Sequence, residues 1–311
     1  MTLRILSTSP LVGSSLQELG DRFEHLTVAE FRSTAWNAGL ATAEALVVML
    51  SEPITESDLQ LAPMLKVIGT YSVGMNHLPL EACKARGIRI VNTPEVLTDA
   101  TADLALAMLL SLTRRLGDGE ALTRSGQWQG WAPDQVLGTG LAGKECGIMG
   151  SGPIGRAFAR RVAALGMKPL FWARAGRSEV DFGAGTAERL PLPELLPRCA
   201  VLSLHCPLTA ETRGLLSRDL LQLLPSGAFI INTARGGILD EQTVIQMLHQ
   251  NRLAGVGLDV YEGEPSINKA WFTAPHSILL PHLGSATVET RTAMAKLLCD
   301  GIGATLAGKL G

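Results

Sequence analysis

Three glycines, at positions 150, 152 and 155, have a spacing that is typical of a phosphate-binding loop. They lie in CGIMGSGPIG (146–155), between an apolar run and a helical pattern. Gly150 can make a tight turn, Gly152 lets the backbone approach a pyrophosphate, and Gly155 lets the following helix press against the strand. A helix that begins at Pro153 would direct its N-terminal amides at the phosphates. The spacing therefore predicts a dinucleotide site, and a turn without a ligand is the alternative.

The residues after the next strand bear on which dinucleotide is bound. An NAD site usually carries Asp or Glu about 20 residues after the glycines, where the carboxylate binds the ribose 2′-hydroxyl. Here KPLFW is followed by Ala173, Arg174 and Arg177, without a carboxylate. Two guanidinium groups can pair with a 2′-phosphate. NADP is therefore the preferred cofactor and NAD the alternative, because both arginines could also be solvated loop charges.

Short apolar runs alternate with helical patterns along the chain, which predicts parallel βαβ units and an α/β fold. Strands are expected at LRILST, 45–50, 65–70, 88–93, 144–150, 168–173, 200–206, 227–233, 255–260 and 277–282. A buried helix is expected over 98–115 and a terminal helix over 288–310. The segment 126–140, rich in Gly, Trp and Pro, predicts an irregular arm whose tryptophans suit an interface.

The composition excludes several classes of protein. The 311 residues are 46% hydrophobic and 18% charged, which predicts a large core rather than disorder. A net charge of −2 without a basic run argues against a nucleic-acid partner. Five cysteines form no C-x-x-C pair, so we expect reduced thiols, no metal site and a cytoplasmic protein. We expect neither a signal peptide nor a membrane span.

Several motifs in fixed order resemble the D-2-hydroxyacid dehydrogenase family, and most of all its glyoxylate/hydroxypyruvate reductase branch. They are YSVGMNHL (71–78), VNTPEVLTDATADLALAMLL (91–110), LAGKECGIMGSGPIG (141–155), HCPLTAETRGLL (205–216), INTARGG (231–237), AGVGLDVYEGEP (254–265) and LLPHLGSAT (279–287). The resemblance implies hydride transfer from NAD(P)H to a small 2-keto acid, giving the D-2-hydroxy acid.

The resemblance also implies a domain organisation with two Rossmann-like parallel-sheet domains. Residues 1–97 and 286–311 would form the substrate-binding domain, which the C-terminal helix completes. Residues 98–285 would form the dinucleotide-binding domain, with the active site in the cleft between the two. An arm around 110–145 would join two copies into a homodimer.

The same resemblance assigns the catalytic residues. His282 matches the proton-donating histidine, and imidazole suits this task because its pKa lies near neutral pH. Glu264 matches the carboxylate beside it; by sequence alone Glu262 is a rival. Arg235 would bind the substrate carboxylate and polarise the keto oxygen. The backbone amides of Val73 and Gly74 would hold the same carboxylate.

A wider set of residues would line the cofactor. Asp259 resembles the acid near the nicotinamide carboxamide, whereas Pro207 and Thr212 could instead only shape a turn. The full set is Thr101, Gly150, Ser151, Gly152, Pro153, Ile154, Gly155, Ala173, Arg174, Arg177, His205, Cys206, Pro207, Thr212, Thr233, Ala234, Arg235, Asp259, His282 and Gly284. For the histidines other than His282, a structural role or a contact on the cofactor side is preferred.

Two other functions fit the same motifs. A 2-ketoaldonate reductase, or a phosphonate- or phosphoglycerate-type dehydrogenase, would keep the chemistry and change the substrate. A nucleotide-sensing corepressor would keep the fold and cofactor without turnover. The small size of the chain favours an enzyme.

Overall fold

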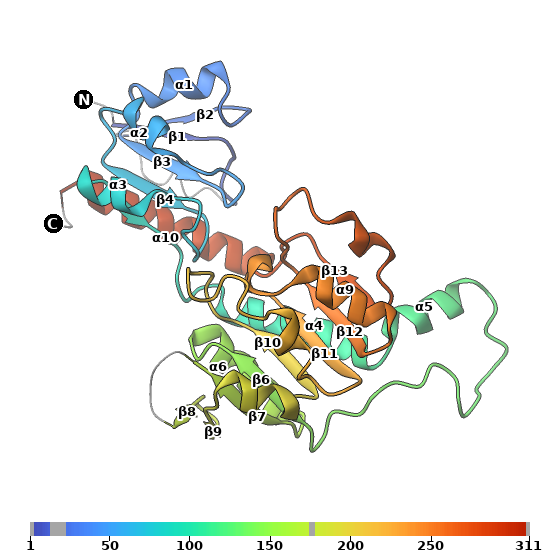
Figure 1. Cartoon of the computed structure of the whole chain (residues 1–311). Helices are drawn as coiled ribbons and strands as arrows, with labels where there is room; N and C mark the ends of the chain where they lie inside the picture. Colours follow the sequence, from blue (N-terminus) through green and yellow to red (C-terminus); the bar gives the residue numbers. More distant parts are fainter. Residues whose placement is uncertain (1–2, 13–22, 174–177, 309–311) are drawn as a thin grey trace. The chain divides into compact units, whose positions relative to one another are not determined.

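The computed structural model describes residues 3–12, 23–173 and 178–308 (Figure 1). The chain divides into two compact units. Unit 1 comprises Met1–Leu97 and Ser285–Gly311, and unit 2 comprises Thr98–Gly284. Each unit is built on one parallel β-sheet.

Unit 1 has a five-stranded sheet in the order β2-β1-β3-β4-β5. Its strands are β1 (Leu3–Ser7), β2 (Phe23–Thr27), β3 (Ala45–Val48), β4 (Val67–Thr70) and β5 (Arg89–Val91). Its helices are α1 (Thr34–Leu40), α2 (Glu56–Gln60), α3 (Leu80–Ala85) and α10 (Val288–Leu306). All four strand pairings are parallel, as the βαβ pattern predicts.

Helix α10 packs on β4 and β5 and so completes unit 1 (Figure 1). Two glycines make this close approach possible. A Cβ on Gly69 of β4 would lie 2.8 Å from Cδ1 of Ile302, and one on Gly301 of α10 would lie 2.5 Å from Cγ1 of Val91. The prediction that the C-terminal helix completes the N-terminal sheet is therefore confirmed.

Unit 2 has a six-stranded parallel sheet in the order β13-β12-β11-β10-β6-β7, beside a small antiparallel hairpin, β8-β9. The sheet strands are β6 (Glu145–Met149), β7 (Lys168–Trp172), β10 (Val201–Leu204), β11 (Ala228–Asn232), β12 (Leu253–Leu258) and β13 (Ser277–Leu279). The hairpin strands are β8 (Glu179–Asp181) and β9 (Thr186–Glu188). The helices are α4 (Thr98–Thr113), α5 (Leu116–Arg124), α6 (Pro153–Ala164), α7 (Leu192–Leu195), η2 (Leu196–Arg198), α8 (Arg218–Leu221), η3 (Gly236–Ile238), α9 (Glu241–His249) and η4 (Lys269–Thr273).

The central strands of unit 2 are buried on both faces. Along β11, Phe229 and Ile231 enter a core with α4 and α6, whereas Ala228 and Ile230 enter a second core with α9 and η4. Successive strand residues point to opposite faces, so a strand covered on both sides must be apolar throughout. This is why GAFIINT could be recognised as a strand.

The segment from α5 to β6 runs out from the sheet of unit 2 as an extended arm (Figure 1). Trp128 is 54% exposed and Trp131 is 85% exposed, which agrees with the irregular arm expected for 126–140. Helix α4 begins at Thr98, as predicted. Among the residues that the structure describes, no helix combines the length and the apolar character needed to cross a bilayer.

Candidate active site

In unit 2, the site residues expected from the sequence lie after the carboxyl ends of neighbouring strands. The glycine loop follows β6, and the other positions follow β10, β11, β12 and β13: His205, Arg235, Asp259 and His282. Parallel strands end at one edge of a sheet, and ligands of open α/β sheets bind outside that edge where the strand order reverses. In unit 2 this reversal falls between β6 and β10.

The glycine loop has the geometry of a pyrophosphate site. Gly150 has φ of +108°, and a Cβ there would lie 2.7 Å from the carbonyl oxygen of His205. A Cβ on Gly155 would lie 2.1 Å from the carbonyl oxygen of Gly150, so α6 can start here only with glycine. At Gly152, by contrast, a Cβ would meet no described atom within 4 Å.

Gly152 is also the N-cap of α6, and no side chain caps this helix end. The N-terminal amides of α6, with the positive end of the helix dipole, are thus left for a ligand. Pro153 occupies the first turn of α6. Nε of Arg156 donates to the carbonyl of Ser151 at 2.8 Å, and this hydrogen bond stabilises the glycine loop. These residues fit the pyrophosphate of a dinucleotide.

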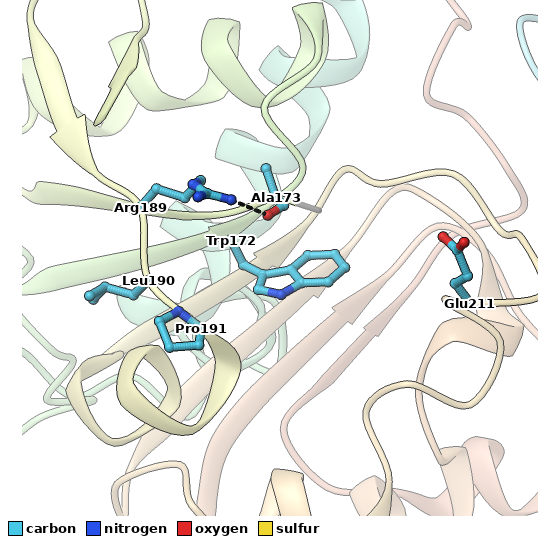
Figure 2. Close-up of a pocket in the computed structure, with 6 residues that line it drawn as sticks. All are labelled: Trp172, Ala173, Arg189, Leu190, Pro191 and Glu211. Carbon is cyan, nitrogen blue, oxygen red and sulfur yellow. Dashed lines mark hydrogen bonds between the residues drawn. The ribbon is translucent and has the colours of Figure 1, made fainter. Parts of the chain in front are cut away.

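A cavity of about 530 Å³ lies at the end of β7, where the second strand of a dinucleotide fold meets the adenosine (Figure 2). Its lining residues are Trp172, Ala173, Arg189, Leu190, Pro191 and Glu211. Nη1 of Arg189 donates to the carbonyl of Ala173 at 3.1 Å. The cavity combines an apolar indole with one guanidinium and one carboxylate, which fits the adenosine half of a dinucleotide. Arg174 and Arg177 lie outside the described residues.

His282 and Glu264 form a hydrogen-bonded couple. Nδ1 of His282 lies 2.8 Å from Oε2 of Glu264, and Oε1 of Glu264 accepts from the amide of Tyr261, also at 2.8 Å. Burial alone would raise the pKa of Glu264. The hydrogen bonds from His282 and Tyr261 and the charges of His282 and Arg235 outweigh it, so the net effect lowers this pKa. The carboxylate therefore stays ionised, and it occupies Nδ1 of His282 rather than Nε2.

Asp259 stabilises the loop that carries His282 through two hydrogen bonds. It is almost fully buried, and its two oxygens accept from the amides of Leu283 and Gly284 at 2.6 and 2.7 Å. His282 itself has φ of +58°, a left-handed conformation that costs a residue with a Cβ about 1 kcal/mol. Burial raises the pKa of Asp259, which the two amides and His282 only partly offset. The carboxylate that the resemblance places near the carboxamide thus also holds the histidine loop.

Arg235 comes from the loop between β11 and η3, and a neighbouring side chain shapes this loop. Asn232 accepts from the amide of Ala234 at 2.9 Å and donates to the carbonyl of Arg235 at 3.0 Å. Burial lowers the pKa of the Arg235 guanidinium, and the charge of Glu264 partly offsets this. The guanidinium is therefore poorly solvated and close enough to Glu264 to interact with it. The structure brings Arg235, Glu264 and His282 together in unit 2.

Other residues expected near the cofactor have well-defined partners. His205 bonds Ser203 through Nε2 at 2.8 Å, and burial lowers its pKa to about 3, so the ring is neutral. Thr233 Oγ1 lies 3.4 Å from Nδ1 of the same ring. Thr101 Oγ1 donates to the carbonyl of Gly284 at 3.0 Å.

The turn after β10 holds Cys206, Pro207 and Thr212. Thr212 is buried, and its hydroxyl donates to the carbonyl of Pro207 at 2.6 Å and accepts from the amide of Thr209 at 2.8 Å. The hydroxyl of Thr212 therefore closes the turn.

In unit 1, the loop after β4 presents Val73 and Gly74. Their carbonyls are held from both sides: Asn92 donates to Val73 at 3.0 Å and Ser72 Oγ donates to Gly74 at 2.6 Å. The structure gives the Val73 and Gly74 amides no hydrogen bond within the described ranges. Such a loop can accept an anion.

Three residues near these sites were not singled out by their sequence: Asn232, Arg189 and Glu241. Asn232 lies within INTARGG, so the motif contained the signal, but not the direction in which its side chain turns. Arg189 lies 16 residues from Ala173 along the chain, and only the fold brings the two together.

Comparison with known proteins shows the family of the chain. The family model for the NAD-binding domain of D-isomer specific 2-hydroxyacid dehydrogenases matches residues 106–284. A glyoxylate reductase from Thermococcus litoralis is 41% identical over 271 residues, covering 86% of this chain and 82% of that protein. A glycerate dehydrogenase from Hyphomicrobium methylovorum is 35% identical over 315 residues, covering 98% and 96%.

A solved structure adds a comparison of the folds. The NADPH-dependent glyoxylate/hydroxypyruvate reductase from Sinorhizobium meliloti, in complex with NADP and malonate, superposes with a TM-score of 0.87 at 30% identity, covering 99% of this chain and 94% of that one. The protein described here is an oxidoreductase with a nicotinamide cofactor. The resemblance found in the motifs is confirmed, and the chain belongs to the D-isomer specific 2-hydroxyacid dehydrogenase family.

Proposed function

We propose that the protein reduces glyoxylate, hydroxypyruvate or a similar small 2-keto acid to the D-2-hydroxy acid, with NADPH as the preferred reductant. The observation that carries the proposal is the 2.8 Å couple of His282 and Glu264, with the partly buried Arg235 in electrostatic contact. The proton and the charge that a 2-keto acid reduction requires come from these side chains. The similarity to glyoxylate and glyoxylate/hydroxypyruvate reductases supports the substrate class.

Each side chain of the site has its own role in the proposed reaction. The nicotinamide cofactor, when bound, supplies the hydride. Nε2 of His282 donates a proton to the carbonyl oxygen, and Glu264 on Nδ1 fixes the tautomer and stabilises the charged ring. Arg235 pairs with the substrate carboxylate and stabilises the developing oxyanion, and its burial makes that interaction stronger than it would be in water. In unit 1, the amides of Val73 and Gly74 would bind an anionic group such as a carboxylate.

The preference for NADPH follows from positive charge beyond the end of β7. Arg174 and Arg177 follow Ala173 in the sequence, and Arg189 lines the cavity at this strand end. The double variant R174A/R177A should raise the KM for NADPH by about tenfold or more, the effect of one lost charge-assisted bond, with the KM for NADH unchanged. An equal response of both cofactors would contradict the preference.

The substrate and the reaction are tested together by an absorbance assay. The purified protein is screened with 2-keto acids of increasing size against NADH and NADPH, and consumption of the reduced cofactor is followed. We expect turnover with glyoxylate or hydroxypyruvate, and the chirality of the product identifies the D isomer. Tight NADPH binding without turnover of any 2-keto acid would favour the corepressor alternative, and a preference for long sugar acids would favour a 2-ketoaldonate reductase.

We further propose that two copies associate through the arm of unit 2 and that the protein works in the cytoplasm. The arm carries the exposed indoles of Trp128 and Trp131, which suit a protein interface. All five cysteines are buried and free, which suits a reducing compartment. Fractionation of the host cell and sedimentation of the purified protein test these two points.

A further inference from the structure

Glu241 is a buried carboxylate whose two oxygens receive two different N–H donors. It is 8% exposed and lies at the start of α9. Oε1 accepts from the amide of Glu262 and Oε2 from the indole Nε1 of Trp271, each at 2.8 Å. Trp271, in η4, is fully buried. This side chain thus joins three separate segments of unit 2.

The amide that Glu241 binds belongs to the loop that carries Glu264. This loop starts after β12, and within it the amide of Tyr261 donates to Oε1 of Glu264. Glu262 follows directly, so the two carboxylates, Glu241 and Glu264, hold adjacent amides of one turn. Moving the amide of Glu262 must also move the amide that fixes Glu264.

The same loop packs on the segment that follows Arg235. A Cβ on Gly236 would lie 1.9 Å from the carbonyl carbon of Tyr261 and 2.1 Å from the amide nitrogen of Glu262. The backbones after Arg235 and before Glu264 are therefore in direct contact, and Glu241 bonds across this contact a few residues further on. A carboxylate suits the position because it offers two acceptors and no donor, which neither a glutamine nor an alcohol provides.

We propose that Glu241 is a positioning residue, which sets the place of the Glu264 carboxylate relative to His282 and Arg235. The proposal rests on the catalytic roles given above for those three residues. Glu241 contacts the loop and not the reactants, so its effect passes through Glu264. Displacement of a reacting group by about 1 Å can cost on the order of a hundredfold in rate.

The charge and the position of Glu241 have opposite effects on Glu264, which makes the proposal testable. The charged groups that act most on Glu264 are His282 and Arg235. The titratable groups Asp259, Tyr261 and Glu262 belong to the same loop, and Glu241 bonds to it. Removing the negative charge of Glu241 would by itself favour ionisation of Glu264 and shift its titration to lower pH. Loosening the loop would weaken the hydrogen bonds that keep Glu264 ionised, and would shift its titration to higher pH.

The experiment compares Glu241→Met with Trp271→Phe. Glu241→Met removes both acceptors at similar volume, whereas Trp271→Phe removes only the indole donor and leaves the bond to Glu262. For Glu241→Met we expect kcat to fall ten- to a hundredfold, about the effect of a misplaced group, with the KM for the cofactor unchanged. The carbon-13 signal of the Glu264 carboxyl should titrate at higher pH than in the wild type. Trp271→Phe should lose stability and keep the wild-type titration.

Two further variants complete the test. Glu194→Met makes the same chemical change at an exposed position and should change neither kcat nor the titration. Glu241→Asp keeps the charge but cannot reach both donors, and it should shift the Glu264 titration upward even if Glu241→Met does not fold. A titration of Glu264 in Glu241→Asp at or below the wild-type pH would overturn the proposal, as would an equal shift in Trp271→Phe. The carboxyl signal needs no turnover, so absence of 2-keto acid reduction would count against the proposed function and leave this test intact.

Discussion

Two opposing effects act on the pKa of the Glu264 carboxyl group. Burial favours its neutral form, yet His282, the Tyr261 amide and Arg235 together hold the pKa below the ordinary value of 4.5. An ionised carboxylate against Nδ1 keeps the proton on Nδ1. The ionisation of Glu264 therefore depends on the hydrogen bonds and charges arranged around it.

Replacement of His282 by Asn should remove the proton donor and keep the cofactor site. We expect kcat to fall about 10²–10⁴-fold, the usual contribution of general acid catalysis, because the glycine loop and the cavity at β7 are untouched. Steady-state kinetics measure kcat, and fluorescence titration measures NADPH affinity. A variant with wild-type kcat would remove His282 from this role.

Replacement of Glu264 by Gln should change how stability depends on pH. A carboxyl whose pKa is lower in the folded than in the unfolded state stabilises the fold above the unfolded pKa, and this contribution disappears as pH falls through the folded pKa. Below pH 4.5 the wild type should therefore lose free energy of unfolding more steeply than Glu264→Gln. Urea denaturation between pH 3 and pH 7, spanning the ordinary carboxyl pKa values, measures both slopes, with the exposed Glu194→Gln as control. Equal slopes would show that Glu264 does not titrate as described.

The sheets were largely predictable from the sequence because parallel strands covered on both faces must be apolar throughout. The strand β2 was missed because FEHLT mixes polar and apolar residues at the edge of its sheet, and the three-residue strands β8 and β9 are too short to show a pattern. The motifs supplied Arg235, Glu264 and His282. The hydrogen bonds of Asn232 could not be predicted because the motif does not give the direction of its side chain. Those of Glu241 could not be predicted because its two donors lie 21 and 30 residues further along the chain.

Two glycines at the start of α6 differ in their surroundings: Gly155 is needed for the fold, whereas Gly152 is left open for a ligand. At Gly152, φ of −72° suits an N-cap, and a side chain would enter open space. Gly152→Ser should keep or raise the melting temperature, because serine caps helices, and its hydroxyl should compete with the pyrophosphate for the amides. We expect the KM for NADPH to rise about tenfold, equivalent to ~1.4 kcal/mol.

Gly155→Ala is the matched variant, because its Cβ would overlap the carbonyl of Gly150. It should lower the free energy of unfolding by about 1–3 kcal/mol, as overpacking does. Thermal unfolding and cofactor titration of both variants test the pair. If Gly152→Ser lost stability and kept its affinity for the cofactor, Gly152 would be needed for the fold and not for the ligand.

The complete histidine–carboxylate–arginine arrangement is built within unit 2, from loops after β11, β12 and β13. In unit 1, the loop after β4 leaves the amides of Val73 and Gly74 without a hydrogen bond among the described residues. The same unit 2 also carries the arm with its exposed apolar side chains. The proposed catalytic arrangement and the proposed association surface therefore lie in different parts of unit 2.

If two copies associate through the arm, its exposed side chains should control the assembly. Trp131 is 85% exposed and Leu137 is 64% exposed, a cost that burial against a second copy would offset. In a two-fold symmetric dimer each substitution acts twice. The double variant W131S/L137S should therefore raise the dimer dissociation constant by about 10⁴-fold or more, given ~1.5 kcal/mol or more for each of the four apolar side chains lost from the dimer. Sedimentation velocity over a concentration series measures this, with the 68% exposed Phe272→Ser as a matched control outside the arm. A monomeric wild type, or equal dissociation in Phe272→Ser, would show that the arm does not join the copies.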